Sequence, residues 1–432
     1  AMNIFAARNT QLYGTGGGNL HHLTFSRHAS YTGVFNLDGD TTITGDLTIG
    51  VGSTLSTNGG DQGDNKALTV GSGNLTASLG HVSVSGILLC NNSVVEIGSL
   101  KIETGGSMTA PNAKLEVRSE SATGYNLEND GTFIHGGNQI QITGPTDGHA
   151  YIKGFTSSHP LSNLYINNAG SGMQTQMLGA LEIEGYLVVQ DGEFYTQGQG
   201  PLDVTNYVTI NSGCIFNGAD STVTHGTLTV NGTYEASSGT TTITGDFDNS
   251  GTFNHNGGTF TYTGTGDVWF GAGTAGVTFD NLTVNPASSS HYLHIAKDVT
   301  VEDTLLISEG HFRMYCSATP VELTMGKTSA VGTITNNADF GFLNNSSNAA
   351  TIQGAAELYP AGIGGTDLDW DNEVNGLINL KWIDYDPDLV TGDNNLTLTL
   401  TGDCEFDAVT ITANDTLDLD ENRVEIDGTF TV

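Results

Sequence analysis

Apolar residues recur at short, regular intervals along most of the chain. Between residues 68 and 117 neighbouring apolar positions are six or seven residues apart, and every third one is twenty residues further on. The resulting runs are Leu68, Leu88 and Met108; Leu75, Val95 and Leu115; and Val82 and Ile102. Within each short segment, apolar residues alternate with Thr or Ser, which is the period of a strand. Three short strands in about twenty residues predict an all-β fold, the single-stranded parallel β-helix or β-solenoid.

A second stretch repeats with a period of nineteen. Residues 221–239 align with residues 240–258, so that Leu228 matches Phe247, Tyr234 matches Phe253 and Gly232 matches Gly251. Gly and Asn-Gly pairs are predicted at the corners of each coil, where the backbone needs a positive φ. Parallel strands joined by crossovers favour a right-handed coil.

A longer repeat spans several coils. At an offset of 118 residues, Ile183 matches Val301, Leu187 matches Leu305, Gly192 matches Gly310 and Phe194 matches Phe312. At about twenty residues per coil, this offset corresponds to six coils. The pattern therefore predicts the duplication of a multi-coil block.

The periodicity divides the chain into three parts of one continuous solenoid. Coils are predicted over residues 1–354 and again over 393–432. Residues 355–392 hold two of the three Trp and two of the eight Pro, and they lose the period. We expect an irregular insert or an extended loop there.

The charge balance excludes several classes of partner. The chain of 432 residues has 47 acidic residues against 12 Lys and Arg, for a formal charge of −35. No cationic cluster is present to neutralise phosphates, so nucleic acid is not an expected partner. An anionic membrane surface would repel the chain, and no apolar run reaches the length that crosses a bilayer. Such acidity suits an extracellular or virion surface, or cation binding.

The four cysteines lie about a hundred residues apart, at Cys90, Cys214, Cys316 and Cys404. No two have the spacing of metal ligands. Residues that far apart in a stacked coil are also too distant to form a disulfide. We interpret them as buried thiols.

Several segments carry a resemblance to known repeats. FDNLTVN (279–285) and DVTVEDTLLISEGHF (298–312) resemble repeats of very large bacterial surface and secreted adhesin-like proteins. TTITGDLTIGVGSTL (41–55) and GDFDNSGTFNHNGGTF (245–260) are similar to repeats in structural, fibre-like proteins of marine tailed bacteriophages. The resemblance covers most of the chain except 355–392. It implies a β-helix on a virion or cell surface, with binding rather than catalysis.

An acidic cluster in the predicted insert is a candidate metal site. Asp367, Asp369, Asp371 and Glu373 would share one side of an extended strand. Such carboxylates repel one another unless a hard cation bridges them, which makes Ca²⁺ the expected cofactor. A solvated acidic loop is the competing interpretation, and the EF-hand pattern fails at Asn372 and Ile378.

Aromatic residues beside these acids are candidates for glycan binding. Trp370, Trp382 and Tyr385 lie in the same aperiodic segment and could stack on sugar rings. Trp269 and Tyr292 are further aromatic candidates. Phe247, Phe253 and Phe260 are expected instead to face inward as a core stack.

The sequence supports catalytic arrangements less strongly than it supports binding sites. Glu182 and Glu184 on one strand, or Glu302 and Asp303, could supply the two carboxylates that glycoside cleavage needs. A β-helix lyase would need Ca²⁺ with an Arg or Lys base, and no such motif is evident. His291 and His294 are three residues apart, which places them on opposite sides of a strand and makes a poor chelate.

The sequence therefore favours a non-enzymatic structural and adhesive β-solenoid of a virion, such as a phage fibre, or of a cell surface. Its expected partners are a cell-surface glycan or receptor and other virion or surface subunits, including further copies in a homotrimer. Two alternatives remain open. One is a β-helix polysaccharide depolymerase, either a lyase or a glycoside hydrolase, and the other is a fragment of a secreted bacterial adhesin passenger.

Overall fold

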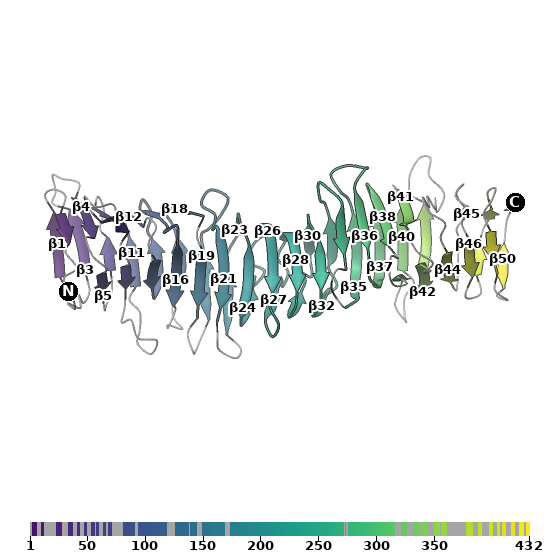
Figure 1. Cartoon of the computed structure of the whole chain (residues 1–432), viewed down its shortest axis with the longest axis horizontal. Coiled ribbons are helices and arrows are strands. Elements are labelled where there is room, and N and C mark those ends of the chain that lie inside the picture. Colours follow the sequence, from purple (N-terminus) through teal and green to yellow (C-terminus); the bar gives the residue numbers. More distant parts are fainter. Residues whose placement is uncertain are drawn as a thin grey trace. The chain divides into compact units, whose positions relative to one another are not determined.

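A computed structural model gives the arrangement of the chain (Figure 1). It describes residues 81–90, 94–118, 126–137, 139–144, 149–168, 173–271, 273 and 275–315. Before residue 81 and after residue 315 it describes only the strands given below with a few adjoining residues. The chain forms two compact units, Ala1–Ser221 and Thr222–Val432. Within the described residues all regular structure is β.

In the first unit, three strands make one coil, and strands of successive coils pair in parallel. The first strands of the coils are β1 (Met2–Ala6), β3 (Leu23–Arg27), β6 (Leu47–Ile49), β11 (His81–Val84), β14 (Ser99–Ile102), β17 (Leu127–Asn129), β20 (Ala150–Lys153), β22 (Gln174–Met177), β25 (Glu193–Tyr195) and β27 (Ile215–Asn217). The second strands are β2 (Thr10–Leu12), β4 (Gly33–Leu37), β7 (Ser53–Ser56), β12 (Ile87–Leu89), β15 (Ser107–Thr109) and β18 (Thr132–Ile134), and later β23 (Leu181–Ile183) and the first part of β26 (Leu202–Ile210). The third strands are β5 (Thr41–Ile43), β10 (Leu68–Val70), β13 (Val94–Ile97), β16 (Lys114–Arg118), β19 (Gln139–Thr143), β21 (Asn163–Asn167), β24 (Leu187–Asp191) and the second part of β26.

The second unit also contains three stacks of parallel strands. One stack holds the first part of β28 (Val223–Val230), β30 (Thr240–Ile243), β33 (Thr259–Tyr262), the second parts of β35 (Val277–Val284) and β37 (Val299–Ile307), β40 (Gly332–Asn336) and β43 (Ala356–Pro360). Another holds the second part of β28, β31 (Phe247–Asn249), β34 (Val268–Phe270), β36 (Tyr292–Ile295), β38 (His311–Tyr315) and β41 (Asp339–Leu343). The last holds the pair β29 (Thr233–Glu235) and β32 (Thr252–Asn254), and the series formed by the first parts of β35 and β37, β39 (Val321–Met325), β42 (Ala350–Gly354), β44 (Leu377–Trp382), β46 (Thr397–Leu400) and β49 (Thr416–Asp418).

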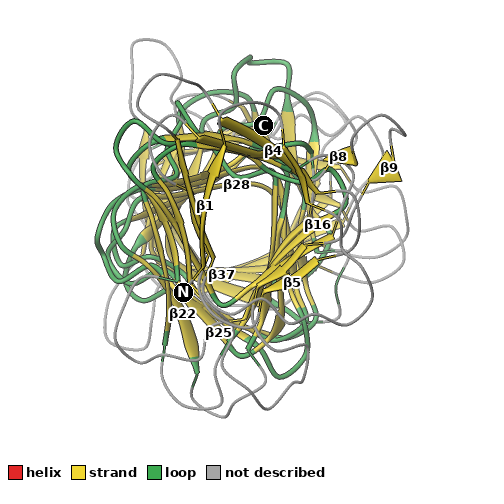
Figure 2. Cartoon of the chain, turned by 90° about the vertical axis from the view of Figure 1, so that its left-hand side faces the viewer, coloured by secondary structure: helices red, strands yellow, loops and turns green. Residues whose placement is uncertain are grey.

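A few strands lie outside these stacks. They are β45 (Asp388–Val390), β48 (Ala408–Thr410) and β51 (Phe430–Thr431), which pair in parallel; β47 (Cys404–Phe406) and β50 (Val424–Ile426), which also pair in parallel; and the antiparallel pair β8 (Asn58–Gly59) and β9 (Asp64–Asn65). Figure 2 shows β8 and β9 at the side of the coils. The strands form the walls of each coil, and loops lie outside them. The predicted parallel β-helix is confirmed.

The core consists of the inward residues of every strand. In β21, for example, Leu164 and Ile166 are fully buried while Tyr165 between them is on the outer side. The β-branched and aromatic residues of such segments fit this half-buried, pleated surface. In the second unit, rings of Phe247, Phe260 and Phe279 contact one another with centroids 5.0 to 6.3 Å apart. The predicted inward phenylalanine stack is confirmed there, and Phe253 contacts the same rings although it is only half-buried.

The register confirms part of the predicted repeat and corrects another part, while Leu75 lies outside the described residues. Leu228 pairs with Phe247, Tyr234 with Phe253 and Leu88 with Met108, as predicted. Two other predicted matches are wrong, because Val82 pairs with Leu100 rather than with Ile102, and Leu68 pairs with Val95 rather than with Leu88. A slip of two residues keeps every apolar side chain inward, so alternation alone cannot exclude it. Paired residues are 18 apart from Val82 to Leu100 but 35 apart from Leu47 to Val82.

The offset of 118 residues joins equivalent conformations but not whole coils. Gly192 and Gly310 have φ of 79° and 76°, and Phe194 and Phe312 are both fully buried. β26, β28, β35 and β37 each turn a corner of the coil, so the two parts of each count as separate segments. Counted in this way, the segment that holds Val301 is the seventeenth after the segment that holds Ile183. Three segments make a coil, so the offset is five coils and two strands. The prediction of six coils is wrong by one strand.

Residues 355–392, the predicted insert, include three strands. β43 pairs with β40, and β44 pairs with β42 on one side and with β46 on the other. β45 pairs with β48. The remaining residues of this range lie outside the described part of the chain. Paired residues Ala350 and Ile378 are 28 apart, so this coil is longer than twenty residues.

Buried asparagine side chains form hydrogen bonds with the backbone at corners of the coils. The Asn249 side chain, which is buried, accepts a hydrogen bond from Gly251 N at 3.2 Å and donates one to Gly276 O at 3.3 Å, in the next coil. Asn129 repeats this arrangement with Gly131 N and Gly154 O, both at 3.2 Å. The side chain thereby satisfies backbone groups that a corner leaves outside the strand ladders.

Asn249→Ala is expected to destabilise the second unit by about 1–3 kcal/mol, because Gly251 N and Gly276 O would lose their buried partner. Urea denaturation followed by circular dichroism measures the change. Asn254→Ala is the matched control, since Asn254 is exposed on the neighbouring strand β32. Equal midpoints for the two variants would show that Asn249 does not fasten the corner.

Candidate functional site

Three tyrosines form a ladder on the outer side of the first unit. Tyr165 lies on β21, Tyr186 directly precedes β24 and Tyr207 lies in β26, so they belong to successive coils. Their neighbours Leu164, Leu187 and Val208 are paired and point into the core, which turns the tyrosines outward. We call these three residues the tyrosine ladder.

The rings of the ladder contact one another directly. Tyr186 and Tyr207 stack with centroids 4.6 Å apart and an interplanar angle of 9°, whereas Tyr165 meets Tyr186 edge to face at 5.6 Å. The hydroxyls of Tyr165 and Tyr186 are 3.0 Å apart. Stacked rings cover each other's faces, so the ladder offers its ring edges and hydroxyls to a ligand. Tyr207 is 39% exposed, the most accessible of these rings.

Burial, followed by the neighbouring phenols, raises the pKa values of Tyr165 and Tyr207 above the ordinary value. The phenols therefore remain neutral at physiological pH. A neutral phenol both donates and accepts a hydrogen bond. The ladder can thus bind hydroxyl groups.

Carboxyl groups lie across one corner from the ladder. Glu182 on β23 is in register with Asp203 on β26, in the next coil. Burial raises the pKa of Glu182, and the charges of Asp203 and Glu184 raise it further. Burial also raises the pKa of Asp203. The structure therefore brings Glu182 together with Asp203 as well as with Glu184, the partner that the sequence suggests.

The corner between these acids and the ladder is tightly packed. Gly185 separates Glu184 from Tyr186, and a Cβ at this position would overlap the backbone oxygen of Ser162 and the side chain of Asn163. Glu184 contacts His135, with Nε2 and Oε2 2.9 Å apart. The positions of Glu184 and Tyr186 are thus set by a corner that admits no side chain at Gly185.

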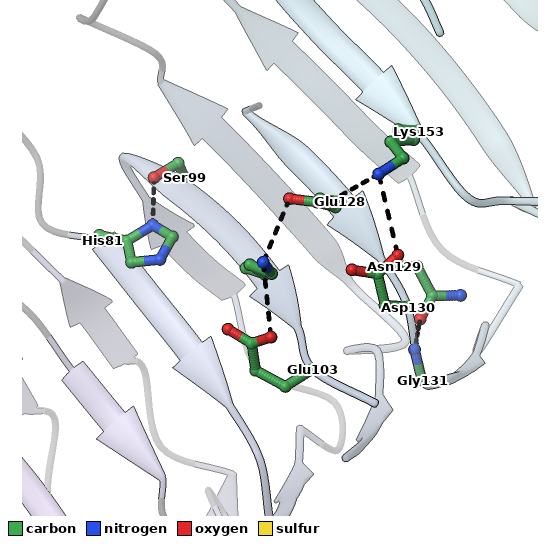
Figure 3. A network of polar contacts seen from close by, with 9 residues as sticks. His81, Ser99, Glu103, Glu128, Asn129, Asp130, Gly131 and Lys153 are labelled. Atoms are coloured by element: carbon green, nitrogen blue, oxygen red, sulfur yellow. Dashed lines mark hydrogen bonds and ion pairs between the residues drawn. The ribbon is translucent and has the colours of Figure 1, made fainter. Parts of the chain in front are cut away.

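A second group of polar residues lies on β14, β17 and β20 (Figure 3). The Glu128 carboxylate, whose side chain is only 6% exposed, is 2.9 Å from the Lys153 ammonium and 3.8 Å from that of Lys101. The three residues are in register on successive coils. Glu103 lies 3.4 Å from Lys101 and Asp130 lies 3.9 Å from Lys153, so the two cations of this group are balanced by carboxylates. The group joins coils and leaves no unbalanced cation of its own for an anionic ligand.

Glu116 on β16 is likewise a buried carboxylate in contact with two cations. Its carboxylate is 2.5 Å from Lys114 Nζ and 2.6 Å from Arg118 Nε. Burial alone would raise the pKa of Glu116, but the hydrogen bonds from Arg118 and Lys114 outweigh it and lower the pKa. We interpret this cluster as structural.

The residues proposed from the sequence for the metal site and the glycan site lie largely outside the described part of the chain. The proposed metal ligands Asp367, Asp369, Asp371 and Glu373 lie outside the described residues. So do Trp370 and Tyr385 of the proposed glycan site. Trp382 ends β44, where its backbone pairs with Gly354, and nothing is described of its side chain. In the described part of the chain, no group of three or more His, Cys, Asp or Glu could hold a metal ion.

Other predictions are tested by described residues. Cys90 and Cys214 are buried free thiols, as predicted, and burial raises the pKa of Cys90 to about 12. Trp269 and Tyr292 lie together on β34 and β36. His294 stacks on Trp269, whereas His291 contacts Asp267, so the two histidines do not converge as a chelate.

The tyrosine ladder was not predicted from the sequence, although the regular spacing of its three residues is visible there. Tyr165, Tyr186 and Tyr207 are each 21 residues apart. This spacing is one coil from Tyr186 to Tyr207 and two residues less than the coil from β21 to β24. Searching the outward positions for side chains that recur once per coil would have found them. The apolar period that reveals the fold draws attention to inward residues instead.

Comparisons with known proteins identify no relative: no family model, no curated protein and no solved structure matches this chain. Among the described residues, no helix has the length and apolar character needed to cross a membrane.

Proposed function

We propose that this chain is a structural and adhesive β-solenoid of a virion or cell surface, and that its outer side binds a glycan or another hydroxyl-rich receptor. The tyrosine ladder is the observation that carries the adhesive part of the proposal. Coils rise by about 4.8 Å, close to the length of one pyranose in an extended chain. A glycan lying along the ladder could therefore meet one tyrosine edge per sugar.

The structural part rests on how the polar side chains are used. Lys101, Glu128 and Lys153 link successive coils, and Gln174 links β22 to Glu193 of β25 at 2.9 Å. These contacts stabilise stacking. Other subunits of the same surface, including further copies of this chain, are the partners expected for such a β-solenoid.

One observation favours a second candidate, a glycoside hydrolase. Glu182, with its raised pKa, is in register with Asp203 beside the ladder. In such an enzyme the protonated Glu182 would donate its proton to the leaving oxygen. The Asp203 carboxylate would then act as nucleophile or as base for water. A lyase for acidic sugars fits less well, because the sequence has no Lys or Arg from residue 154 to residue 296.

Retention on immobilised neutral polysaccharides, xylan and mannan, tests the adhesive function, with reducing ends followed in the same samples. We expect retention without new reducing ends. Tyr186→Ala should weaken retention about ten-fold, and Tyr207→Phe should weaken it less, because the stack survives without its hydroxyl. Thr304→Ala is the matched control, since Thr304 is the residue 118 positions after Tyr186.

Reducing ends that disappear in Glu182→Gln would establish the hydrolase instead. Equal retention of the wild type and Tyr186→Ala would remove the ladder from the proposed binding surface. A melting curve for each variant separates loss of binding from loss of folding.

A further inference from the structure

Trp269, Tyr292 and His294 form a second aromatic surface, on β34 and β36 of the second unit. Trp269 is in register with His294, and their rings stack with centroids 4.3 Å apart and an angle of 19°. Tyr292 lies two residues before His294, and these rings are nearly parallel at 5.6 Å. His294 is buried, whereas Trp269 keeps 36% of its surface exposed.

A carboxylate lies one coil before each of the two larger rings. Asp246 Oδ1 accepts a hydrogen bond from Trp269 N at 2.9 Å, and Asp267 Oδ1 accepts one from Tyr292 N at 3.0 Å. The Asp267 side chain is half exposed. A carboxylate has about four acceptor positions, so each can accept further hydrogen bonds from a ligand.

The duplicated block shows that the scaffold does not require aromatic residues at two of these three positions. The residues 118 positions before Trp269, Tyr292 and His294 are Tyr151, Gln174 and Gln176. Tyr151 is in register with Gln176, as Trp269 is with His294. The two glutamines bond each other at 2.5 Å along β22, so an amide pair occupies the place that Tyr292 and His294 take on β36. The change to an exposed Trp269 and a half-buried Tyr292 therefore adds a surface property rather than a missing stacking contact.

Charge restricts the ligand. The stretch from residue 154 to residue 296 contains these residues and no Lys or Arg. Beyond it, Arg313 is in register with His294 in the next coil, on the side away from Asp246, and Lys297 lies beside Gly271. Uronate, sulfate or sialate groups placed beside Asp246 and Asp267 would face like charges, which repel in close contact. Sugar hydroxyls, in contrast, can donate to these carboxylates while the ring carbons contact Trp269 and Tyr292.

We propose that Trp269, Tyr292, Asp246 and Asp267 form a second binding site, which takes an uncharged glycan. The site is separate from the tyrosine ladder and uses none of its residues. A failure of binding through Tyr186 would therefore not contradict this second site.

Tryptophan fluorescence of the full chain tests this proposal, because only three Trp are present. The probes are xylohexaose and mannohexaose, which are neutral, and hexagalacturonate, which is anionic. We expect a neutral hexasaccharide to change the emission of the wild type, and Trp269→Phe to lose that change. Hexagalacturonate should give no change at low salt.

Calorimetry of the same probes supplies affinities for variants without the tryptophan signal. Trp269→Ala and Asp267→Asn are expected to weaken binding at least ten-fold. Asn at position 267 keeps an acceptor for Tyr292 N, so that variant should fold. Tyr151→Ala, at the equivalent position of the other block, and Tyr186→Ala, in the tyrosine ladder, should leave the fluorescence response unchanged.

Three outcomes would overturn the proposal. They are the absence of a response to both neutral probes, a response that survives in Trp269→Phe, and binding of hexagalacturonate as tight as that of the neutral sugars. Loss of the response in Tyr186→Ala would assign the binding to the tyrosine ladder instead.

Discussion

Lowering the pH from 7 to 4 is expected to destabilise the second unit, and replacing one buried histidine should remove part of that effect. His225 on β28 is fully buried, and its Nε2 is 2.5 Å from the hydroxyl of Tyr234, which is also fully buried. Burial lowers the pKa of His225 to about 3, from an ordinary value of about 6.5. The folded chain therefore keeps this imidazole neutral at pH 4.

The direction of the effect follows from proton uptake. Below about pH 6.5 the unfolded chain protonates His225, while the folded chain does so only near pH 3. The unfolded state binds more protons in that window, so the contribution to stability is complete above pH 6.5 and is lost as the pH falls. The slope is about 1.4 kcal/mol per pH unit for one such group.

Urea denaturation at pH 7, 6, 5 and 4 measures this linkage. The double variant His225→Leu/Tyr234→Phe removes both polar groups of the pair, so neither remains buried without its partner. Carboxylates also titrate near pH 4, and the informative quantity is the difference in slope between the wild type and the variant. His255→Gln is the control, because the His255 side chain is 25% exposed. Identical slopes for the wild type and the double variant would contradict the assignment.

The sequence predicts the fold well because inward positions repeat in composition as well as in spacing. Leu228 and Phe247, or Tyr234 and Phe253, lie between Gly corners of constant separation, and their pairing follows directly. The prediction fails where loop lengths vary. From Leu47 to Val82 the coil takes 35 residues, and no periodicity can fix the register across such a change.

The offset of 118 residues shows the same limit on a larger scale. Matched residues such as Gly192 and Gly310 share a conformation, because a corner requires it. Local conformation does not, however, record which side of the coil a strand occupies. All three strands of a coil carry the same inward alternation, so a block can match another one strand out of phase.

The binding surfaces were predictable only in part. Trp269 and Tyr292 stand out as aromatic residues in a polar sequence. Their carboxylate neighbours Asp246 and Asp267 become visible only once the register is known, because each lies one coil earlier. Outward residues are free of the packing constraint that makes the core periodic. The residues that make up such a surface therefore come from neighbouring coils and are not adjacent in the sequence.

Gly154→Ala is expected to be the most damaging single substitution in the first unit, and Gly105→Ala is its matched control. The two glycines have nearly the same backbone conformation, with φ of 84° and 81°. An alanine at either position incurs the cost of the left-handed region, about 1–2 kcal/mol. The difference between the variants therefore isolates the effect of the surroundings.

Those surroundings differ sharply. A Cβ on Gly105 would meet nothing within 4 Å, whereas a Cβ on Gly154 would overlap the backbone oxygen of Asn129 in the preceding coil. That backbone cannot move aside without loss of the hydrogen bond from Asn129 Nδ2 to Gly154 O and of the adjoining strand pairing. Overpacking of this kind adds about 1–3 kcal/mol or more to the strain of the backbone.

Thermal and urea denaturation of the two variants provide the comparison. We expect Gly105→Ala to unfold in one transition, at a midpoint slightly below that of the wild type. Gly154→Ala should unfold at a much lower midpoint or fail to give a cooperative transition. If the two variants lose equal stability, the cost comes from φ alone, and the close approach of Gly154 to Asn129 does not govern how these coils stack.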